Sequence, residues 1–232
     1  MKILITGASR GIGKAIANNL EGEIYASARN EELLKKYYDN YFVADLSKSD
    51  DIKNLGKYIE ENQIDVLINN AGEYIYSKAE DMTLEQIERL FKVNVQAGMY
   101  LSACAVKNMK KSGWGRIINI ASISGSIGEA NASLYSATKS AYYGMSKSLA
   151  LELATNNITV NVINPGWVDT DLGNESISEG EFSKDELIEC IPQRRFVTPD
   201  EIGKAVKYLI SEDARGITGQ VINICAGLSV GG

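Results

Sequence analysis

The 232-residue chain contains no histidine, and this absence excludes several kinds of catalytic site. A serine or cysteine nucleophile activated by histidine, an HExxH zinc site and a haem with a proximal histidine all need an imidazole. Proton transfer must therefore use tyrosine, lysine, a carboxyl group or a thiol. We expect no metal site.

Cysteines and long apolar runs are also scarce. The three cysteines, Cys104, Cys190 and Cys225, lie too far apart for a CxxC motif, and an odd number does not suit a disulfide framework. We expect buried thiols in a reducing cytosol. No run approaches the roughly 18 apolar residues of a membrane helix, and the N-terminus lacks the apolar stretch of a signal peptide. The sequence predicts a cytoplasmic protein without a membrane partner.

Basic residues are in the minority, with 24 Lys and Arg against 30 Asp and Glu and a net charge of −6. Binding to nucleic acid depends on a basic face that neutralises phosphates. We therefore expect no nucleic-acid partner. The apolar share of 44% and the charged share of 23% are those of a soluble globular protein.

Short apolar, β-branched runs alternate with longer helical patterns along the whole chain. Because most of these runs are apolar throughout, they indicate a parallel sheet covered on both faces. The sequence predicts a single α/β domain over residues 1–232, a doubly wound Rossmann-type fold with a seven-stranded parallel sheet. The expected strands are Lys2–Thr6, Glu23–Ala28, Tyr41–Ala44, Val66–Asn69, Arg116–Ala121, Ile158–Asn164 and Val221–Ile224, and the expected helices are Gly11–Leu20, Asp50–Asn62, Leu84–Lys110, Tyr135–Thr155 and Pro199–Leu209.

A polar segment that begins at Gly173 interrupts this apolar rhythm. Two interpretations of residues 173–198 stay open: a flap over a substrate pocket, or a solvated loop.

The first predicted strand runs directly into the sequence TGASRGIG, residues 6–13, and then into a helix. Glycines in this context allow a tight turn and a close approach of the backbone to a pyrophosphate, which the helix N-terminus attracts. Where an acid at the end of the second strand would favour NAD, this chain has Arg29, and Arg10 adds a second cation. The two arginines are either solvated surface residues or a clamp for the 2′-phosphate of NADP(H).

Polar residues follow two further strands, where open α/β sheets bind their ligands. Asp45 ends the third strand, and Asn70-Ala71-Gly72 follows the fourth. Both could also be plain turns.

Without histidine, a Tyr and a Lys one helical turn apart are a sensible proton-transfer pair, because a nearby cation stabilises a phenolate. The YxxxK pattern occurs at Tyr74/Lys78, Tyr135/Lys139 and Tyr143/Lys147. Only Tyr135 has a serine, Ser122, thirteen residues earlier at a strand end. We expect a packing or surface role for Tyr143.

With these motifs in order along the chain, the sequence resembles the short-chain dehydrogenase/reductase family. The match covers TGASRGIG, NNAG, Asn94, Ser122, YSATK at residues 135–139 and NPG at residues 164–166. One departure is Cys225-Ala226-Gly227, where many members have Asp or Asn followed by two glycines.

The resemblance implies a catalytic set of Asn94, Ser122, Tyr135 and Lys139. Ser122 would bind the substrate carbonyl, Tyr135 would donate its proton, Lys139 would lower the tyrosine pKa and hold the nicotinamide ribose, and Asn94 would hold a water. Pattern and resemblance together give these cofactor-binding residues: Gly7, Ser9, Arg10, Gly11, Ile12, Gly13, Arg29, Asp45, Leu46, Asn70, Ala71, Gly72, Tyr135, Lys139, Pro165, Gly166, Val168 and Thr170.

The segment around residues 191–202 and the GRIINI strand look most like 3-oxoacyl-(acyl-carrier-protein) reductases, enzymes of fatty acid biosynthesis. Reduction of a 3-oxoacyl thioester is the leading hypothesis. The alternatives are another ketone, sugar, steroid or quinone, or a protein that senses NADPH without turnover. We expect Tyr74, Ser122 and Tyr135 to contact the substrate.

Two expectations concern partners. A basic group at Lys107, Lys110, Lys111 and Arg116 is either a docking surface for an acidic carrier protein or a solvated helix end. The long helices 84–110 and 135–155 carry apolar residues on more than one face. The resemblance implies a homodimer or homotetramer, while a thick monomer core stays possible.

Overall fold

The sheet occupies the centre of the computed structural model, which describes residues 1–171, 173, 177 and 183–230. Within these residues, seven parallel strands pair in the order β3-β2-β1-β4-β5-β6-β7, which confirms the predicted fold class. The strands are β1 (Lys2–Thr6), β2 (Glu23–Ala28), β3 (Asn40–Val43), β4 (Val66–Asn69), β5 (Gly115–Ile120), β6 (Ile158–Pro165) and β7 (Val221–Ile224).

The apolar character of the strands follows from the two layers of helices that cover them. In β1, Ile3 and Ile5 pack into one hydrophobic cluster, while Leu4 packs into the cluster on the opposite face. All residues of β4, β5 and β6 are buried. Burial on both faces removes the need for alternation, so these strands are mainly apolar, and the polar residues that they contain are buried as well.

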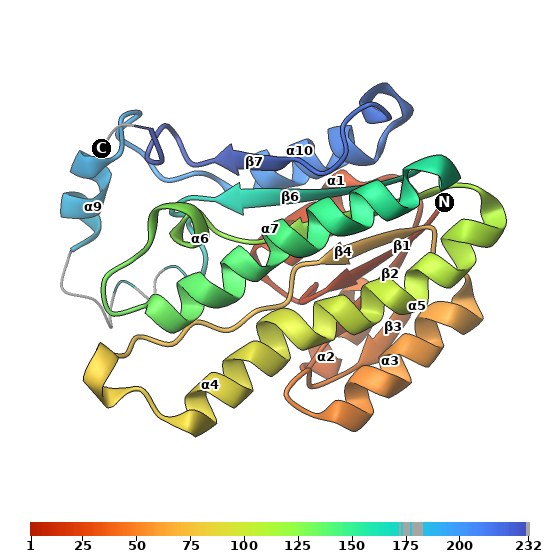
Figure 1. Ribbon diagram of the computed structural model, residues 1–232, viewed down its shortest axis with the longest axis horizontal. Helices are drawn as coiled ribbons and strands as arrows, with labels where there is room; N and C mark the ends of the chain where they lie inside the picture. Colours follow the sequence, from red (N-terminus) through yellow and green to blue (C-terminus); the bar gives the residue numbers. More distant parts are fainter. Residues whose placement is uncertain (172, 174–176, 178–182, 231–232) are drawn as a thin grey trace.

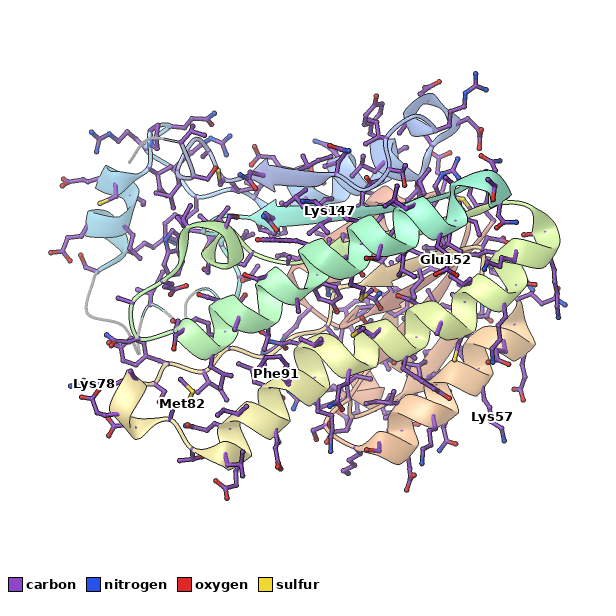
Figure 2. All side chains as sticks on the ribbon, viewed as in Figure 1. Lys57, Lys78, Met82, Phe91, Lys147 and Glu152 are labelled. Carbon is purple, nitrogen blue, oxygen red and sulfur yellow. The ribbon has the colours of Figure 1, made fainter. Side chains whose placement is uncertain are left out.

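The helices divide between the two faces. On one face lie α1 (Gly11–Asn19), α2 (Glu31–Tyr37) and α10 (Pro199–Ile210). On the other lie α3 (Ser49–Asn62), α5 (Ala97–Ser112) and α7 (Ser133–Leu153), which stand side by side in front of the sheet in Figure 1. Their outer surfaces carry exposed charged residues such as Lys57, Lys147 and Glu152 (Figure 2).

The predicted helix Leu84–Lys110 consists of three parts. An α-helical segment, α4 (Leu84–Phe91), passes through a π-helical turn, Lys92–Gln96, into α5. In this turn the Ala97 amide donates to the Lys92 carbonyl, five residues earlier. The wider turn places Asn94 in the fully buried interior, and such π-helical turns are frequent at functional sites.

Other differences from the sequence prediction are small. The short helix α2 was not predicted, although Asn30 caps it by accepting from the Leu33 amide. The last proline before the polar segment, Pro165, is the final residue of β6. Two short helices, α6 (Ser124–Ile127) and α9 (Lys184–Cys190), were also missed. Both are shorter than the window over which a helical pattern can be recognised.

Within residues 173–198, the structure describes Gly173, Ile177 and residues 183–198. These include α9 and a bridge between Val168 and Val197. The rest of the segment, where we expected a flap or a solvated loop, lies outside the described residues.

The cysteine prediction was wrong for one residue. Cys104 and Cys225 are buried, but Cys190 at the end of α9 is exposed, and all three are free thiols. Cys190 falls in a seven-residue helix without a buried residue, so the general tendency of cysteine toward burial does not decide its position.

Candidate active site

The glycine turn after β1 is as tight as the sequence predicts. Gly7 and Gly11 have φ angles of 69° and 54°, a backbone conformation that favours glycine. A Cβ on Gly13 would lie 2.3 Å from the Gly7 carbonyl oxygen, so no larger residue fits there. The residue before α1, Arg10, provides no side-chain cap. The first amide groups of α1 therefore have no side-chain acceptor from that position and can bind an anion.

Two neighbouring clefts lie at the carboxyl ends of the strands. The first, about 420 Å³, is lined by these predicted cofactor-binding residues: Gly7, Ser9, Arg10, Gly11, Ile12, Gly13, Arg29, Asp45, Leu46, Asn70, Ala71, Gly72, Tyr135, Lys139 and Thr170. The other three, Pro165, Gly166 and Val168, line the second cleft of about 350 Å³. Ile12, Ala121, Tyr135 and Thr170 line both clefts.

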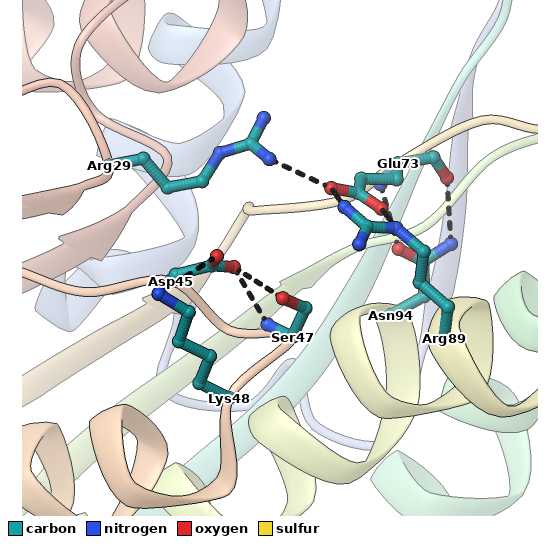
Figure 3. Close-up of polar contacts among 7 residues, drawn as sticks. All are labelled: Arg29, Asp45, Ser47, Lys48, Glu73, Arg89 and Asn94. Carbon is teal, nitrogen blue, oxygen red and sulfur yellow. Dashed lines mark hydrogen bonds and ion pairs between the residues drawn. The ribbon is translucent and has the colours of Figure 1, made fainter.

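Charged residues that line the first cleft, among them Arg29, Asp45 and Glu73, take part in a group of polar contacts (Figure 3). The Arg29 guanidinium donates to Glu73 Oε1 at 3.0 Å, and Arg89 binds the same carboxylate through Nε and Nη2, each at 2.8 Å. The Glu73 side chain is only 19% exposed, against 57% for Arg29. The Arg29 guanidinium is therefore accessible to solvent, and it forms an ion pair with the less accessible Glu73 carboxylate. No sequence motif pointed to Glu73 or Arg89.

The second predicted cation, Arg10, also has an acidic partner, because its Nη1 lies 3.5 Å from Asp171 Oδ2. Asp45 accepts from the amide and hydroxyl of Ser47 at 3.0 and 2.8 Å. Burial alone would raise the pKa of Asp45, but these hydrogen bonds, with Arg29 and Lys48 nearby, lower it. Asp45 is thus a carboxylate at neutral pH.

Asn70 supports the glycine turn from β4. Its side-chain amide donates to the carbonyl oxygens of Thr6 at 2.9 Å and Gly7 at 3.3 Å. The amides of Asn70 and Ala71 both donate to Thr6 Oγ1 at 3.0 Å. These bonds fix the ends of β1 and β4 against each other.

The four predicted catalytic residues come together from three elements. Ser122 follows β5, Tyr135 and Lys139 lie one turn apart on α7, and Asn94 lies on the π-helical turn. The Lys139 ammonium is 5.5 Å from the centre of the Tyr135 ring and donates to the Ile120 carbonyl at 3.1 Å. The Tyr135 hydroxyl forms a hydrogen bond with the Ser122 side chain.

Gly72 explains how Asn94 and Lys139 approach each other. A Cβ on Gly72 would lie 3.2 Å from Lys139 Nζ and 3.3 Å from Asn94 Oδ1. The Asn94 side chain binds Glu73 twice, accepting from its amide at 2.8 Å and donating to its carbonyl at 2.9 Å. The NNAG segment is thereby joined to the centre of the site.

The pKa of Tyr135 differs from what the sequence led us to expect. Burial raises the pKa of this hydroxyl, and the negative charge of Glu129 adds to the increase, while the hydrogen bond with Ser122 lowers it. Burial also lowers the pKa of Lys139 to about 8. In the protein without cofactor, the Lys139 ammonium therefore does not lower the pKa of Tyr135 below its usual value. The free-energy cost of burying a phenolate is larger than any stabilisation that the ammonium provides.

The other two YxxxK tyrosines have different positions. Tyr143 donates to the Ser122 carbonyl and accepts from Asn164, both at 2.9 Å, and so holds the strand ends together, as its expected packing role requires. Tyr74 lies against Tyr135, with ring centres 5.0 Å apart, and lines the second cleft.

The second cleft has mainly apolar and aromatic walls. They include Tyr74, Tyr76, Ile127, Trp167 and Leu187. One charged residue that lines this cleft was not predicted, namely Glu129, which lies between Ser122 and Tyr135 in the sequence.

Cys225 and Ala226, where many family members have Asp or Asn followed by glycine, fit into the turn after β7. Ala226 has a φ of 53°, a conformation that favours glycine. Gly166 packs directly on Cys225, since a Cβ on Gly166 would lie 2.9 Å from Cys225 Cα and Cβ. The segment after β7 therefore lies against the end of β6.

The expected basic docking group is not a single exposed patch. The Arg116 side chain is fully buried and binds Glu212 at 3.1 Å. Lys107 pairs with Glu60 at 2.8 Å, and Lys110 pairs with Glu152 at 3.2 Å. Arg116 is thus a buried structural residue of β5.

The described residues contain neither a metal-binding cluster nor a membrane-spanning helix. No group of three or more Cys, Asp or Glu side chains there could hold a metal ion. No helix in the same residues is both long and apolar enough to cross a membrane.

The parallel sheet, the glycine turn and the Ser122, Tyr135, Lys139 and Asn94 group define one class of protein. A family model described as enoyl-(acyl carrier protein) reductase matches residues 7–229. The chain belongs to the short-chain dehydrogenase/reductase family, whose members are oxidoreductases that act on carbonyl and hydroxyl groups.

Several individual proteins of this family are similar to the chain over nearly its whole length. The chain is 37% identical to a 3-oxoacyl-[acyl-carrier-protein] reductase of Rickettsia bellii over 97% of this chain and 95% of the relative. A 3-oxoacyl-[acyl-carrier-protein] reductase of Mycobacterium bovis is 34% identical over 99% and 93%. Among solved structures, an actinorhodin polyketide ketoreductase with NADPH has a TM-score of 0.92 at 32% identity, covering 99% of this chain and 97% of that one.

Proposed function

We propose that this protein reduces the ketone of a 3-oxoacyl thioester, carried on acyl carrier protein, to a hydroxyl group with NADPH. The curated relatives named above support the substrate, and the NADPH-bound ketoreductase supports the cofactor. The observation that carries the proposal is the position of Tyr135, which lines both clefts beside Ser122 and Lys139.

The first cleft fits a dinucleotide. Its glycine turn leaves no room for a Cβ at Gly13, so the backbone can approach a pyrophosphate, and the N-terminus of α1 provides amide donors. We assign the 2′-phosphate to Arg29, with Arg10 as a second cation. The remaining predicted residues along this cleft and at residues 165–168 would hold the rest of the molecule.

When bound, NADPH supplies the hydride that reduces the carbonyl carbon. Ser122 binds the carbonyl oxygen, and Tyr135 donates its proton to that oxygen. The Lys139 ammonium lies on the same helix face and stabilises the phenolate that Tyr135 becomes. Asn94 holds the Glu73 backbone, and we assign to it the water that returns a proton to the site.

Turnover with a panel of carbonyl compounds tests this proposal. The purified protein is mixed with NADPH and either an acetoacetyl thioester, a quinone or a keto sugar, and NADPH consumption is followed by absorbance. We expect the thioester to give the largest kcat/KM. A larger value for the quinone or the sugar contradicts the substrate assignment, and tight NADPH binding without any turnover indicates a sensor.

We also propose that the protein is a homodimer or homotetramer in the cytoplasm. Exposed apolar residues on α5 and α7 support the assembly, namely Met99, Tyr100 and Leu151, which is 84% exposed. The three free thiols support a reducing compartment. Light scattering of the purified protein tests the assembly, and a monomer mass contradicts it.

A further inference from the structure

The second cleft has a single charged side chain among the described residues that line it. That residue is Glu129, and the other lining residues are apolar, aromatic, hydroxyl-bearing or amide-bearing. The cleft thus has a negative charge and, in the part that the structure describes, no cation to bind an acidic substrate group.

Hydrogen bonds hold the Glu129 carboxylate close to the reacting groups. Its Oε1 accepts from the Tyr74 hydroxyl at 2.8 Å, and its Oε2 accepts from Ser124 Oγ at 2.6 Å. Ser124 Oγ in turn accepts from Ser122 Oγ at 3.1 Å. One hydroxyl group therefore separates the carboxylate from the serine that we assign to the substrate carbonyl.

These partners are all neutral, so they do not cancel the charge of Glu129. Within the described residues Glu129 forms no ion pair, and it is half-buried, where water screens a charge less than at the surface. The field of Glu129 reaches Tyr135, because it contributes to the raised pKa of that hydroxyl. A negative group on a substrate bound at Tyr135 must experience the same repulsion.

We propose that Glu129 is a specificity-determining residue, which makes the second cleft accept uncharged 3-oxo compounds, such as thioesters, and reject the free 3-oxo acids. The inference rests on the proposed function, because it assumes that the substrate ketone binds at Ser122 and Tyr135. In a 3-oxo acid the carboxylate is two carbons from the ketone carbon. With the ketone oxygen at Tyr135, that carboxylate stays near Glu129, whereas the thioester carbonyl at the same place has no charge.

The test compares one neutral and one anionic substrate that share the acetoacetyl group. We measure kcat/KM for the acetoacetyl thioester of N-acetylcysteamine and for acetoacetate, with NADPH, in the wild type and in Glu129→Gln. The wild type is expected to prefer the thioester strongly. The substitution keeps the shape of the side chain but removes its charge, and we expect the preference to fall about tenfold or more.

Two variants separate the charge from other effects of the substitution. Tyr74→Phe removes one hydrogen bond to Glu129 but leaves the carboxylate, so the substrate ratio should change by about fivefold at most, the usual value of one neutral hydrogen bond, and by less than in Glu129→Gln. Glu61→Gln makes the same charge change at an exposed position on α3, outside both clefts, and should leave the ratio unchanged.

Direct binding distinguishes failure of this inference from failure of the proposed function. Calorimetry with acetoacetate and its ethyl ester gives a ratio of Kd values without turnover. A binding ratio that Glu129→Gln reduces, in a protein that turns over no 3-oxo compound, supports the role of Glu129 and contradicts the proposed reaction. The inference is overturned if the wild type binds and reduces the acid as well as the neutral compound, or if Glu129→Gln leaves the ratio unchanged.

Discussion

The two clefts differ most in their charge. Arg10, Arg29, Asp45, Glu73, Lys139 and Asp171 all line the first cleft, whereas Glu129 is the charged residue described in the second. The cations of the first cleft can form charge-assisted hydrogen bonds with the phosphates of a dinucleotide, and its carboxylates can accept hydrogen bonds from hydroxyl groups. Apolar walls with one carboxylate select instead by shape and by the absence of negative charge. Tyr135, which both clefts share, is where the two kinds of recognition meet.

Removal of the shared hydroxyl should have the largest effect. In Tyr135→Phe we expect kcat to fall about a hundred- to ten-thousandfold, the usual contribution of a positioned general acid. NADPH affinity should change little, because the charges of the first cleft remain. Steady-state kinetics and a fluorescence titration measure the two quantities, with Tyr208→Phe on the exposed surface of α10 as the control. Turnover close to that of the wild type would disprove the catalytic assignment.

Reversal of one charge in the first cleft should change the choice of cofactor. In Arg29→Asp we expect the ratio of NADPH to NADH affinity to fall by about ten- to a hundredfold, because a charge-assisted contact becomes a repulsive one. Titration of each cofactor gives the ratio. Equal affinity for both cofactors before and after the substitution would exclude a phosphate clamp at Arg29.

Lys139 should lower the stability of the fold, because its ammonium is buried. Its pKa is lowered from 10.5 to about 8 in the folded protein, so below about pH 8 the folded state carries the full cost of the buried charge. That cost decreases as the pH rises toward 10.5, where the unfolded chain also loses the proton. Lys139→Met should therefore raise the free energy of unfolding by about 1–3 kcal/mol at neutral pH, and by less in alkaline buffer.

Urea unfolding at neutral and at alkaline pH measures this gain, and Lys147→Met, exposed on the same helix, provides the matched control. A gain that does not depend on pH would show that the ammonium is not the cause. We expect Lys139→Met to be inactive in spite of its stability.

The smallest effect concerns the ion pair at the mouth of the first cleft. Glu73 and a bound 2′-phosphate compete for Arg29, while Arg89 stays with Glu73. In Glu73→Gln we expect NADPH to bind about two- to fivefold more tightly, the range of an exposed ion pair, with no change for NADH. The effect should vanish in an Arg29→Ala background, and its persistence there would assign it to another contact.

The strands and the motifs of this fold could be predicted because their causes are local. Burial on both faces makes β4, β5 and β6 mainly apolar without alternation, and the positive φ angles of Gly7 and Gly11 favour glycine. The proximity of Ser122, Tyr135 and Lys139 could also be predicted, since one strand end and one helix turn determine it.

Residues that meet only through loops were not predicted. Glu73 follows the NNAG motif and forms ion pairs with Arg29 and Arg89, which lie 44 and 16 residues away in the sequence. Glu129 lies in the turn between α6 and α7. The direction of the Tyr135 pKa shift was also missed, because it depends on how deeply the ring is buried, and a sequence pattern does not contain that quantity.

The π-helical turn between α4 and α5 has a consequence for how such a site is built. A π-helical turn holds one more residue than an α-helical turn, and each residue of an α-helix rotates the chain by about 100°. The extra residue lets α5 keep Leu101 and Met109 against the sheet, while Asn94 faces the Glu73 backbone. The number of residues in this turn, rather than their identity alone, thus decides which side chain reaches the reaction centre. In a chain one residue shorter at this point, a residue other than Asn94 would have to donate to the Glu73 carbonyl.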